Sequence, residues 1–354
     1  MSAPQNRYAS RGLRARRGLI VMAALAVVFL IGRVIWANGV FSSVPTGFLG
    51  ACKLVATVPG VEDIETANGL VFVSVASARG PDARDGIYLL GEDGKLTKLT
   101  GAPKDFHPRG IGLYRSPDGS GIFLMAVNRR SSGRFSIDSF EVTNPNPTLV
   151  AQGTIEGGLL TDPQDVAAAG PGAFYVSNNS AKQNFVKWLV SLGVLPGSDI
   201  LYFNGMSFRP VGQDVYGARG LLLAPDGNHL LVASLTARSL KSFSRDPFSG
   251  NLTEDDSLTL PAAPEKISLD ARGEVLVAGH ASLLDWRAFA ANPAKRAPSQ
   301  IFRVSLLGGV PQQATQIYGN DGKEIAAASI GASIGKRLLI GSSLDDKLLD
   351  CTAN

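Results

Sequence analysis

Six times along the 354 residues of this chain, a tight turn that contains glycine leads into a short apolar segment. The turn glycines lie roughly 50 residues apart, which leaves room for several strands in each repeat. The six copies are Ala67 to Ser74, Pro117 to Val127, Gly170 to Ser177, Pro225 to Ser234, Ala271 to Gly279 and Ile334 to Ser342. Repeats of this length and content predict an all-β, six-bladed β-propeller, in which equivalent positions of all blades meet at one central axis.

The segment before the first repeat has a different composition. Residues 1–61 contain seven Lys and Arg and no acidic residue, whereas the remainder contains 27 Lys and Arg against 30 Asp and Glu. Residues 18–37 are apolar apart from Arg33 and are long enough to cross a bilayer as a helix. Five arginines precede this stretch, so its N-terminal end is expected to stay in the cytoplasm.

These patterns predict four segments: a basic cytoplasmic tail at 1–17, a transmembrane signal anchor at 18–37, a linker at 38–51 and the propeller at 52–354. A cleaved signal peptide is the alternative for the apolar stretch, because the uninterrupted run is short and Ala37 can end a cleavage site. In the first case the propeller is membrane-anchored, and in the second it is secreted. Both place it in the periplasmic or extracellular space. Its mild net negative charge excludes nucleic acid as a partner class.

The two cysteines support export from the cytoplasm. Cys52 precedes the first repeat and Cys351 lies three residues from the end. Because a propeller closes its ring by joining its first and last segments, these two positions are expected to be neighbours. In an oxidising compartment they would form a disulfide across the closure. Two unrelated buried thiols are the alternative.

A second short apolar segment precedes each glycine turn, and two residues, mostly polar or charged, precede that segment. The six pairs are Glu62-Asp63, Arg109-Gly110, Gln164-Asp165, Arg219-Gly220, Glu265-Lys266 and Lys323-Glu324. If these positions are equivalent, they form one ring at one mouth of the central tunnel. Polar residues that merely end strands are the alternative, since most proteins have them.

These same segments resemble the paraoxonase/arylesterase family, distant relatives of the gluconolactonase-type propellers. The likeness spans roughly residues 50–351. It is carried by GVEDIETANGLVFVS (60–74), FHPRGIGLY (106–114), DPQDVAAAGPGAFYVSNN (162–179), RGLLLAPDGNHLLVAS (219–234), EKISLDARGEVLVAGH (265–280) and GKRLLIGSSLDDKLLDC (335–351). The resemblance implies a six-bladed propeller with two calcium ions in its tunnel, one structural and one that polarises the substrate carbonyl. It also implies hydrolysis of lactones and aryl esters.

The sequence retains the ligands of the two implied calcium sites to different extents. For the structural ion, the resemblance implies the carboxylates of Asp63 and Asp165 and the backbone carbonyl of Ile111. Calcium prefers such oxygen ligands, so we expect one structural Ca²⁺ to be retained.

The catalytic ion is doubtful. The resemblance implies that Glu62 is a ligand, and Gln164 still offers an amide oxygen. At the remaining positions stand Arg219 and the pair Glu265-Lys266, and Arg and Lys are donors that do not ligate a cation. We therefore predict that the two basic side chains replace this ion and form ion pairs with Glu62 and Glu265.

The resemblance also implies two active-site histidines, but Arg109 and Arg129 stand in their places. His107 lies two residues before the first of these positions and would face the same way in a β-segment, so it is a candidate base. His280 matches a tunnel-side histidine of the family, with a satisfied core histidine as the alternative.

Two functions follow from these observations. The first is a membrane-anchored hydrolase of carboxylic esters or lactones at the tunnel mouth. Its catalytic candidates are Glu62, Arg219, Lys266, His107 and Arg109, and its substrate-binding candidates are Arg129, Glu265 and His280. The alternative is a non-catalytic propeller whose cationic mouth binds an anionic small molecule or a protein partner, because guanidinium groups suit carboxylates and phosphates.

Overall fold

The predicted glycine turns close antiparallel hairpins in the computed structural model, which describes residues 6–119, 121–180 and 184–353. Five of the six turn glycines have φ between 59° and 78°: Gly69, Gly119, Gly227, Gly273 and Gly335. Glycine adopts this left-handed conformation without steric cost because it lacks a Cβ atom. The recurring glycine therefore reports a recurring hairpin.

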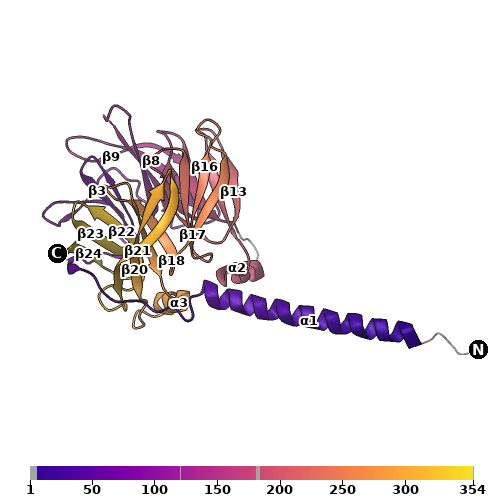
Figure 1. Cartoon of the computed structure of the whole chain (residues 1–354). Coiled ribbons are helices and arrows are strands. Elements are labelled where there is room, and N and C mark those ends of the chain that lie inside the picture. The colour runs from indigo at the N-terminus through magenta and orange to yellow at the C-terminus, as the bar shows by residue number, and fades with distance from the viewer. Residues whose placement is uncertain (1–5, 120, 181–183, 354) are drawn as a thin grey trace, which may run out of the picture.

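Six four-stranded antiparallel sheets surround one axis, as predicted (Figure 1). Blade 1 contains β2 (Val61–Ala67), β3 (Leu70–Val75), β4 (Gly86–Leu90) and β5 (Leu96–Lys98), and blade 2 contains β6 (Pro108–Arg115), β7 (Ile122–Arg129), β8 (Phe135–Val142) and β9 (Leu149–Ile155). Blade 3 contains β10 (Pro163–Ala168), β11 (Phe174–Asn179), β12 (Ser198–Phe203) and β13 (Phe208–Val215), and blade 4 contains β14 (Ala218–Leu223), β15 (His229–Ser234), β16 (Ser239–Arg245) and β17 (Leu252–Thr259). Blade 5 contains β18 (Ala263–Leu269), β19 (Val275–His280), β20 (Ser299–Leu307) and β21 (Val310–Asn320), and blade 6 contains β22 (Ala328–Ile334), β23 (Arg337–Ser342), β24 (Leu348–Ala353) and β1 (Gly50–Ala56).

The first and last strands of the propeller close the ring in one sheet. Strand β1 pairs antiparallel with β24, and Cys52 faces Cys351 in their register. The two cysteines form a disulfide across a sequence separation of 299 residues, so the predicted staple is confirmed. The strand begins at Gly50, two residues before the predicted start of the propeller.

The described residues also form three helices: α1 (Asn6–Ala37), α2 (Asn184–Ser191) and α3 (Leu283–Ala291). Helix α1 projects away from the side of the propeller that carries α2 and α3 (Figure 1). Its segment Arg16–Ala37 is the one stretch among the described residues that is long and apolar enough to cross a membrane. The helix already begins at Asn6, within the predicted tail, whose first five residues lie outside the described part. A signal anchor and a signal peptide both fit these observations.

The apolar core lies between neighbouring blades. Phe72 and Ile87 of blade 1, for example, pack in one fully buried cluster with Leu124 and Phe140 of blade 2. Burying each such side chain contributes on the order of 1.5–3 kcal/mol. This packing fills the space between neighbouring blades.

The innermost strand of every blade has an irregularity near the same end. The register shifts lie between Val61 and Asp63, Pro108 and Ile111, Pro163 and Asp165, Ala218 and Leu221, Pro264 and Ile267, and Ala328 and Ile330. A regular strand sends successive side chains to opposite faces, whereas a bulge re-aims one of them. The bulges therefore let two consecutive side chains, such as Glu62 and Asp63, both approach the axis.

Candidate functional site

The predicted polar ring comes together at one end of the tunnel. A cavity of about 300 Å³, here called the inner chamber, is lined by Glu62, His107, Arg109, Arg129, Gln164, Arg219, Glu265 and Lys266 among others. These residues come from five different blades. The sixth pair, Lys323-Glu324, is not part of this wall, and the Glu324 carboxylate instead accepts a hydrogen bond from Tyr318.

Three neighbouring residues, Asp63, Asp165 and Lys266, are here called the axial cluster; of these, Lys266 also lines the chamber. The Lys266 Nζ atom is 2.9 Å from Asp165 Oδ1 and 3.7 Å from Asp63 Oδ2. It also donates a hydrogen bond of 2.8 Å to the backbone carbonyl of Gln164. All three side chains of the cluster are buried, with at most 4% of their surface exposed.

Both carboxylates of the axial cluster also accept hydrogen bonds from the backbone. Asp63 accepts from the N–H of the residue that follows it and from the N–H of Ile111 in blade 2. Asp165 accepts likewise from its successor and from the N–H of Leu221 in blade 4. Burial opposes a charge on Lys266, but the two carboxylates outweigh it and raise its pKa above the usual value. Lys266 is therefore an ammonium ion at any physiological pH.

The residues of the axial cluster do not fit a bound calcium ion as they lie. The Lys266 ammonium stands against the two carboxylates that were expected to hold the ion, and Ile111 turns its N–H rather than its carbonyl toward Asp63. Among the residues that the structure describes, no group of three or more His, Cys, Asp or Glu side chains is placed to hold a metal ion. The expected structural Ca²⁺ thus finds no support in this geometry.

Arg219 and Lys266, which were predicted to replace the catalytic ion, have different ion-pair partners. Arg219 makes the predicted ion pair with Glu265, with 3.6 Å between Nη1 and Oε1, and donates a 2.6 Å hydrogen bond to Gln164 Oε1. Lys266, in contrast, pairs with Asp63 and Asp165 and not with Glu62 or Glu265, which corrects the prediction. The physical reason is the bulge between Pro264 and Ile267 in β18, which re-aims Lys266 so that its ammonium reaches Asp63 and Asp165.

Among the chamber residues that the structure describes, Glu62 is the one carboxylate without a partner. Its side chain makes no hydrogen bond or ion pair with any residue in the described ranges. Burial raises its pKa to about 7, although Arg109 and Lys266 act in the opposite direction. A carboxyl group with this pKa can both accept and release a proton at neutral pH.

Comparison with known proteins identifies the family. A family model for arylesterases matches residues 90–352, which is more than half of the chain. This chain belongs to the arylesterase family.

The chain is also similar to curated proteins and solved structures. Bovine serum paraoxonase/arylesterase 2 is 26% identical over 308 residues, which cover 82% of this chain and 86% of the relative. Human serum paraoxonase/arylesterase 1 is 26% identical over 310 residues, with the same coverage. A gluconolactonase from Xanthomonas campestris has a TM-score of 0.53 at 14% identity, covering 87% of this chain and 91% of its own. The calcium-binding protein regucalcin from Agrobacterium tumefaciens has a TM-score of 0.52 at 12% identity, covering 88% and 97%. The structural likenesses support the fold.

The two candidate histidines of this arylesterase-family protein are placed differently: His107 lines the chamber, whereas His280 is not among the chamber residues and its ring nitrogens make no hydrogen bond within the described part of the chain. The His107 ring nitrogens lie 2.7 Å from Asp85 Oδ2 and 3.2 Å from Asp105 Oδ1, so both are engaged. His280 is 1% exposed, and its Nε2 atom lies 3.5 Å from Glu265 Oε2. Burial raises the pKa of Glu265, but Arg219 and His280 outweigh it and lower that pKa to about 2. His280 therefore helps to keep Glu265 ionised.

The two arginines at the chamber rim differ in their partners. Arg109 donates a 2.9 Å hydrogen bond to Asp162, which the sequence analysis did not single out. Asp162 precedes Gln164 by two residues, and this period-two spacing was the available signal. The Arg129 side chain lines the chamber and makes no hydrogen bond or ion pair within the described part of the chain.

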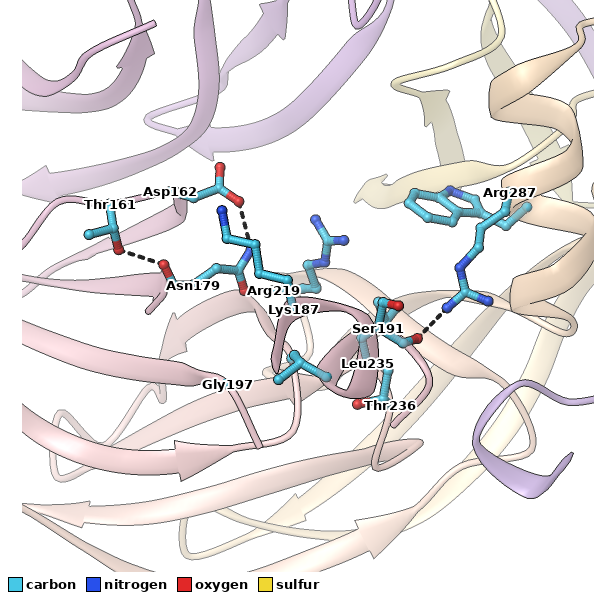
Figure 2. A pocket seen from close by; sticks show the side chains of 13 residues that line it. Thr161, Asp162, Asn179, Lys187, Ser191, Gly197, Arg219, Leu235, Thr236 and Arg287 are labelled. Carbon is cyan, nitrogen blue, oxygen red and sulfur yellow. Dashed lines mark hydrogen bonds between the residues drawn. The ribbon is translucent and has the colours of Figure 1, made fainter. Parts of the chain in front are cut away.

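A second cavity of about 510 Å³, here called the vestibule, adjoins the inner chamber. The two share Asp162, Asn179, Arg219 and Trp286 as wall residues. Helices α2 and α3 complete the vestibule, with Lys187 on the former (Figure 2). Trp286 also lies 5.9 Å from the Arg219 guanidinium. Trp286 and Arg287 were not predicted as site residues, because α3 interrupts the repeats.

Proposed function

We propose that this arylesterase-family protein hydrolyses carboxylic esters or lactones in the inner chamber, with Glu62 as the residue that activates water. The observation that carries this proposal is the position of Glu62 in a cavity, where its carboxyl group has no partner among the described residues and its pKa is raised to about 7. Family membership supports the hydrolase class, and curated relatives are named as arylesterases and a lactonase. The alternative of a non-catalytic binder gains no support from these relatives.

In the proposed reaction, ionised Glu62 takes a proton from a water molecule while the water oxygen attacks the ester carbonyl carbon. The carbonyl oxygen becomes an oxyanion, which the guanidinium of Arg219 stabilises from the same chamber wall. The tetrahedral intermediate then breaks its C–O bond, and protonated Glu62 returns the proton to the leaving oxygen. Lys266 takes no part in this step, because its ammonium is committed to the axial cluster.

The vestibule supports an extended substrate. Its volume of about 510 Å³ exceeds that of the chamber, and Val190, Leu235 and Trp286 give its wall an apolar portion. An acyl or aryl arm can lie there while the reacting carbonyl reaches Glu62 and Arg219. Pockets of this kind combine an apolar lining with a few polar groups that fix orientation.

The location of the site is the second part of the proposal. Ala37 and Asn38, at the end of α1, are buried, and Asn38 bonds both to the Leu192 carbonyl and to the Arg287 guanidinium beside the vestibule. We propose that α1 is retained as a signal anchor, with the propeller outside the cytoplasm. Helices α2 and α3 would then lie near the bilayer, because they are on the side of the propeller from which α1 extends (Figure 1). N-terminal sequencing of the purified protein checks this. A mature chain that begins near Asn38 would contradict it.

The hydrolase assignment is tested with the full chain, purified in detergent, against a panel of lactones and phenyl acetate. We expect turnover that Glu62→Gln lowers by about 10²-fold or more, because the variant has no base. Glu92→Gln is the matched control, since Glu92 lies on the exposed turn between β4 and β5. A folded protein with no turnover on the whole panel would contradict the activity. Unchanged turnover in Glu62→Gln would contradict the role of Glu62.

A further inference from the structure

The axial cluster is built around a positive charge that belongs to the chain itself. The buried Lys266 ammonium contacts two carboxylates and a backbone carbonyl, from Asp165, Asp63 and Gln164. We infer that Lys266 is a permanent replacement for a metal ion on the propeller axis, so that the blades hold together without a divalent cation at Asp63 and Asp165. This inference concerns the fold and is independent of the proposed reaction.

The axial cluster joins several blades. Lys266 extends from β18 in blade 5 to Asp63 of β2 in blade 1 and Asp165 of β10 in blade 3. Through backbone N–H groups the same carboxylates also reach Ile111 in blade 2 and Leu221 in blade 4. Five of the six blades thus meet at one ion-pair network, the position from which a single ion would hold a propeller together.

Two buried carboxylates without a cation would destabilise the native state. Two buried carboxylates close to one axis repel each other unless a cation lies beside them. The ammonium supplies that charge without dissociating, whereas a calcium ion is in exchange with solution and takes six to eight oxygen ligands. At Asp63 and Asp165 the oxygens already accept backbone hydrogen bonds. The cluster therefore satisfies one ammonium better than it would a metal ion.

The backbone around the ion pair is shaped to admit it. Gly110 packs against the ion pair so closely that a Cβ atom at this position would overlap both Asp165 Oδ1 and Lys266 Nζ. Gly110 is not in a left-handed conformation, so backbone strain does not require glycine here. The absent side chain instead makes room for the ion pair. This steric match indicates a site shaped around the lysine side chain.

The inference is tested on the full chain in detergent by thermal unfolding and by elemental analysis for calcium. For the wild type we expect no stoichiometric calcium, and the same Tm with a chelator and with added Ca²⁺. Lys266→Asn removes the charge and adds an amide oxygen, so its Tm should fall and should rise again with Ca²⁺, because a ligand that binds the native state stabilises it. Lys53→Asn is the control, since Lys53 pairs with Asp350 but is largely exposed. It should show neither effect.

Two results would overturn the inference. One is a wild-type protein that carries one calcium ion per chain or loses thermal stability in a chelator. The other is a Lys266→Asn variant that keeps the wild-type Tm and does not respond to Ca²⁺. If that variant does not fold, the chelator and calcium measurements on the wild type still decide the question. Because no readout is enzymatic, failure of the proposed hydrolysis would leave this test intact.

Discussion

Glu62 and Asp63 are neighbours in β2, yet their carboxyl groups have different hydrogen-bond and ion-pair partners. Asp63 accepts two backbone hydrogen bonds and faces the Lys266 ammonium. Glu62 has no such partner among the described residues, and burial raises its pKa to about 7. One residue of difference in sequence separates a carboxylate that supports the fold from a carboxyl group that is free for chemistry.

Partners and burial together determine what a tunnel carboxylate can do, because burial also raises the pKa of Asp165 although Lys266 and the backbone N–H of Leu221 act in the opposite direction. The two neighbouring carboxyl groups of β2 are drawn toward the axis by the bulge between Val61 and Asp63. Backbone N–H groups and an ammonium favour the charged form, whereas a cavity without donors favours the neutral form. A propeller can therefore place a structural and a reactive carboxyl group side by side on one strand.

The largest expected effect comes from removing a partner of Lys266 in the axial cluster. Asp165→Asn leaves the Lys266 charge with Asp63 alone, and removing one partner of a buried pair costs about 3–5 kcal/mol of unfolding free energy. Thermal unfolding by circular dichroism measures the loss. Asp82→Asn, which removes an exposed pair with Arg84, should change Tm little. Equal Tm values for Asp165→Asn and wild type would show that the axial cluster is not a structural element.

A somewhat smaller effect is expected at Arg219, the residue proposed to stabilise the oxyanion. Arg219→Gln keeps an amide donor but loses the guanidinium, so kcat for ester hydrolysis should fall about 10²–10³-fold, or about 2.7–4 kcal/mol. Arg209→Gln is the matched control, because Arg209 also lies over an aromatic ring, that of Tyr202, but outside the chamber wall. A change in KM with unchanged kcat would assign Arg219 to substrate binding instead.

The pH dependence of stability tests the raised pKa of Glu62, and so its contrast with Asp63. A carboxyl group whose folded pKa is about 7, against an ordinary 4.5, binds more protons in the native state. Its contribution to stability is thus present below pH 4.5 and is lost as pH rises toward 7, at a cost of up to about 3 kcal/mol. Glu62→Gln should lack this loss, so its Tm relative to wild type should rise between pH 5 and pH 8. A constant difference would contradict the raised pKa.

The smallest effect is expected at Arg129, which has no side-chain partner in the described residues. Arg129→Gln should leave the free energy of unfolding within about 0.5 kcal/mol of wild type. If this cation selects substrates, KM for an ester with a carboxylate on its arm should rise, while KM for a neutral ester of the same size stays constant. Steady-state kinetics with such a pair of esters measures the difference. An equal change for both esters would count against charge selection.

Several features were predictable because they are local or follow from closure of the ring. Glycine favours a turn with positive φ, which five of the six predicted turn glycines adopt, so Gly69 and its counterparts indicated the blades. Cys52 and Cys351 were expected to meet because a circular fold joins its first and last segments. The ring of axial residues followed from the same repeats.

The partners of these residues were decided by the tertiary structure. Sequence alone indicated that Lys266 would counter a carboxylate, but the bulge in β18 and the distances across the axis sent it to Asp165 and Asp63. Trp286 and Lys187 reach the vestibule from helices that carry no repeat signal. Periodic sequence determines which residues share the axis, because hairpin geometry is set by nearby residues. Only the packed ring determines which charges meet, because electrostatic pairing depends on distances between blades far apart in the chain.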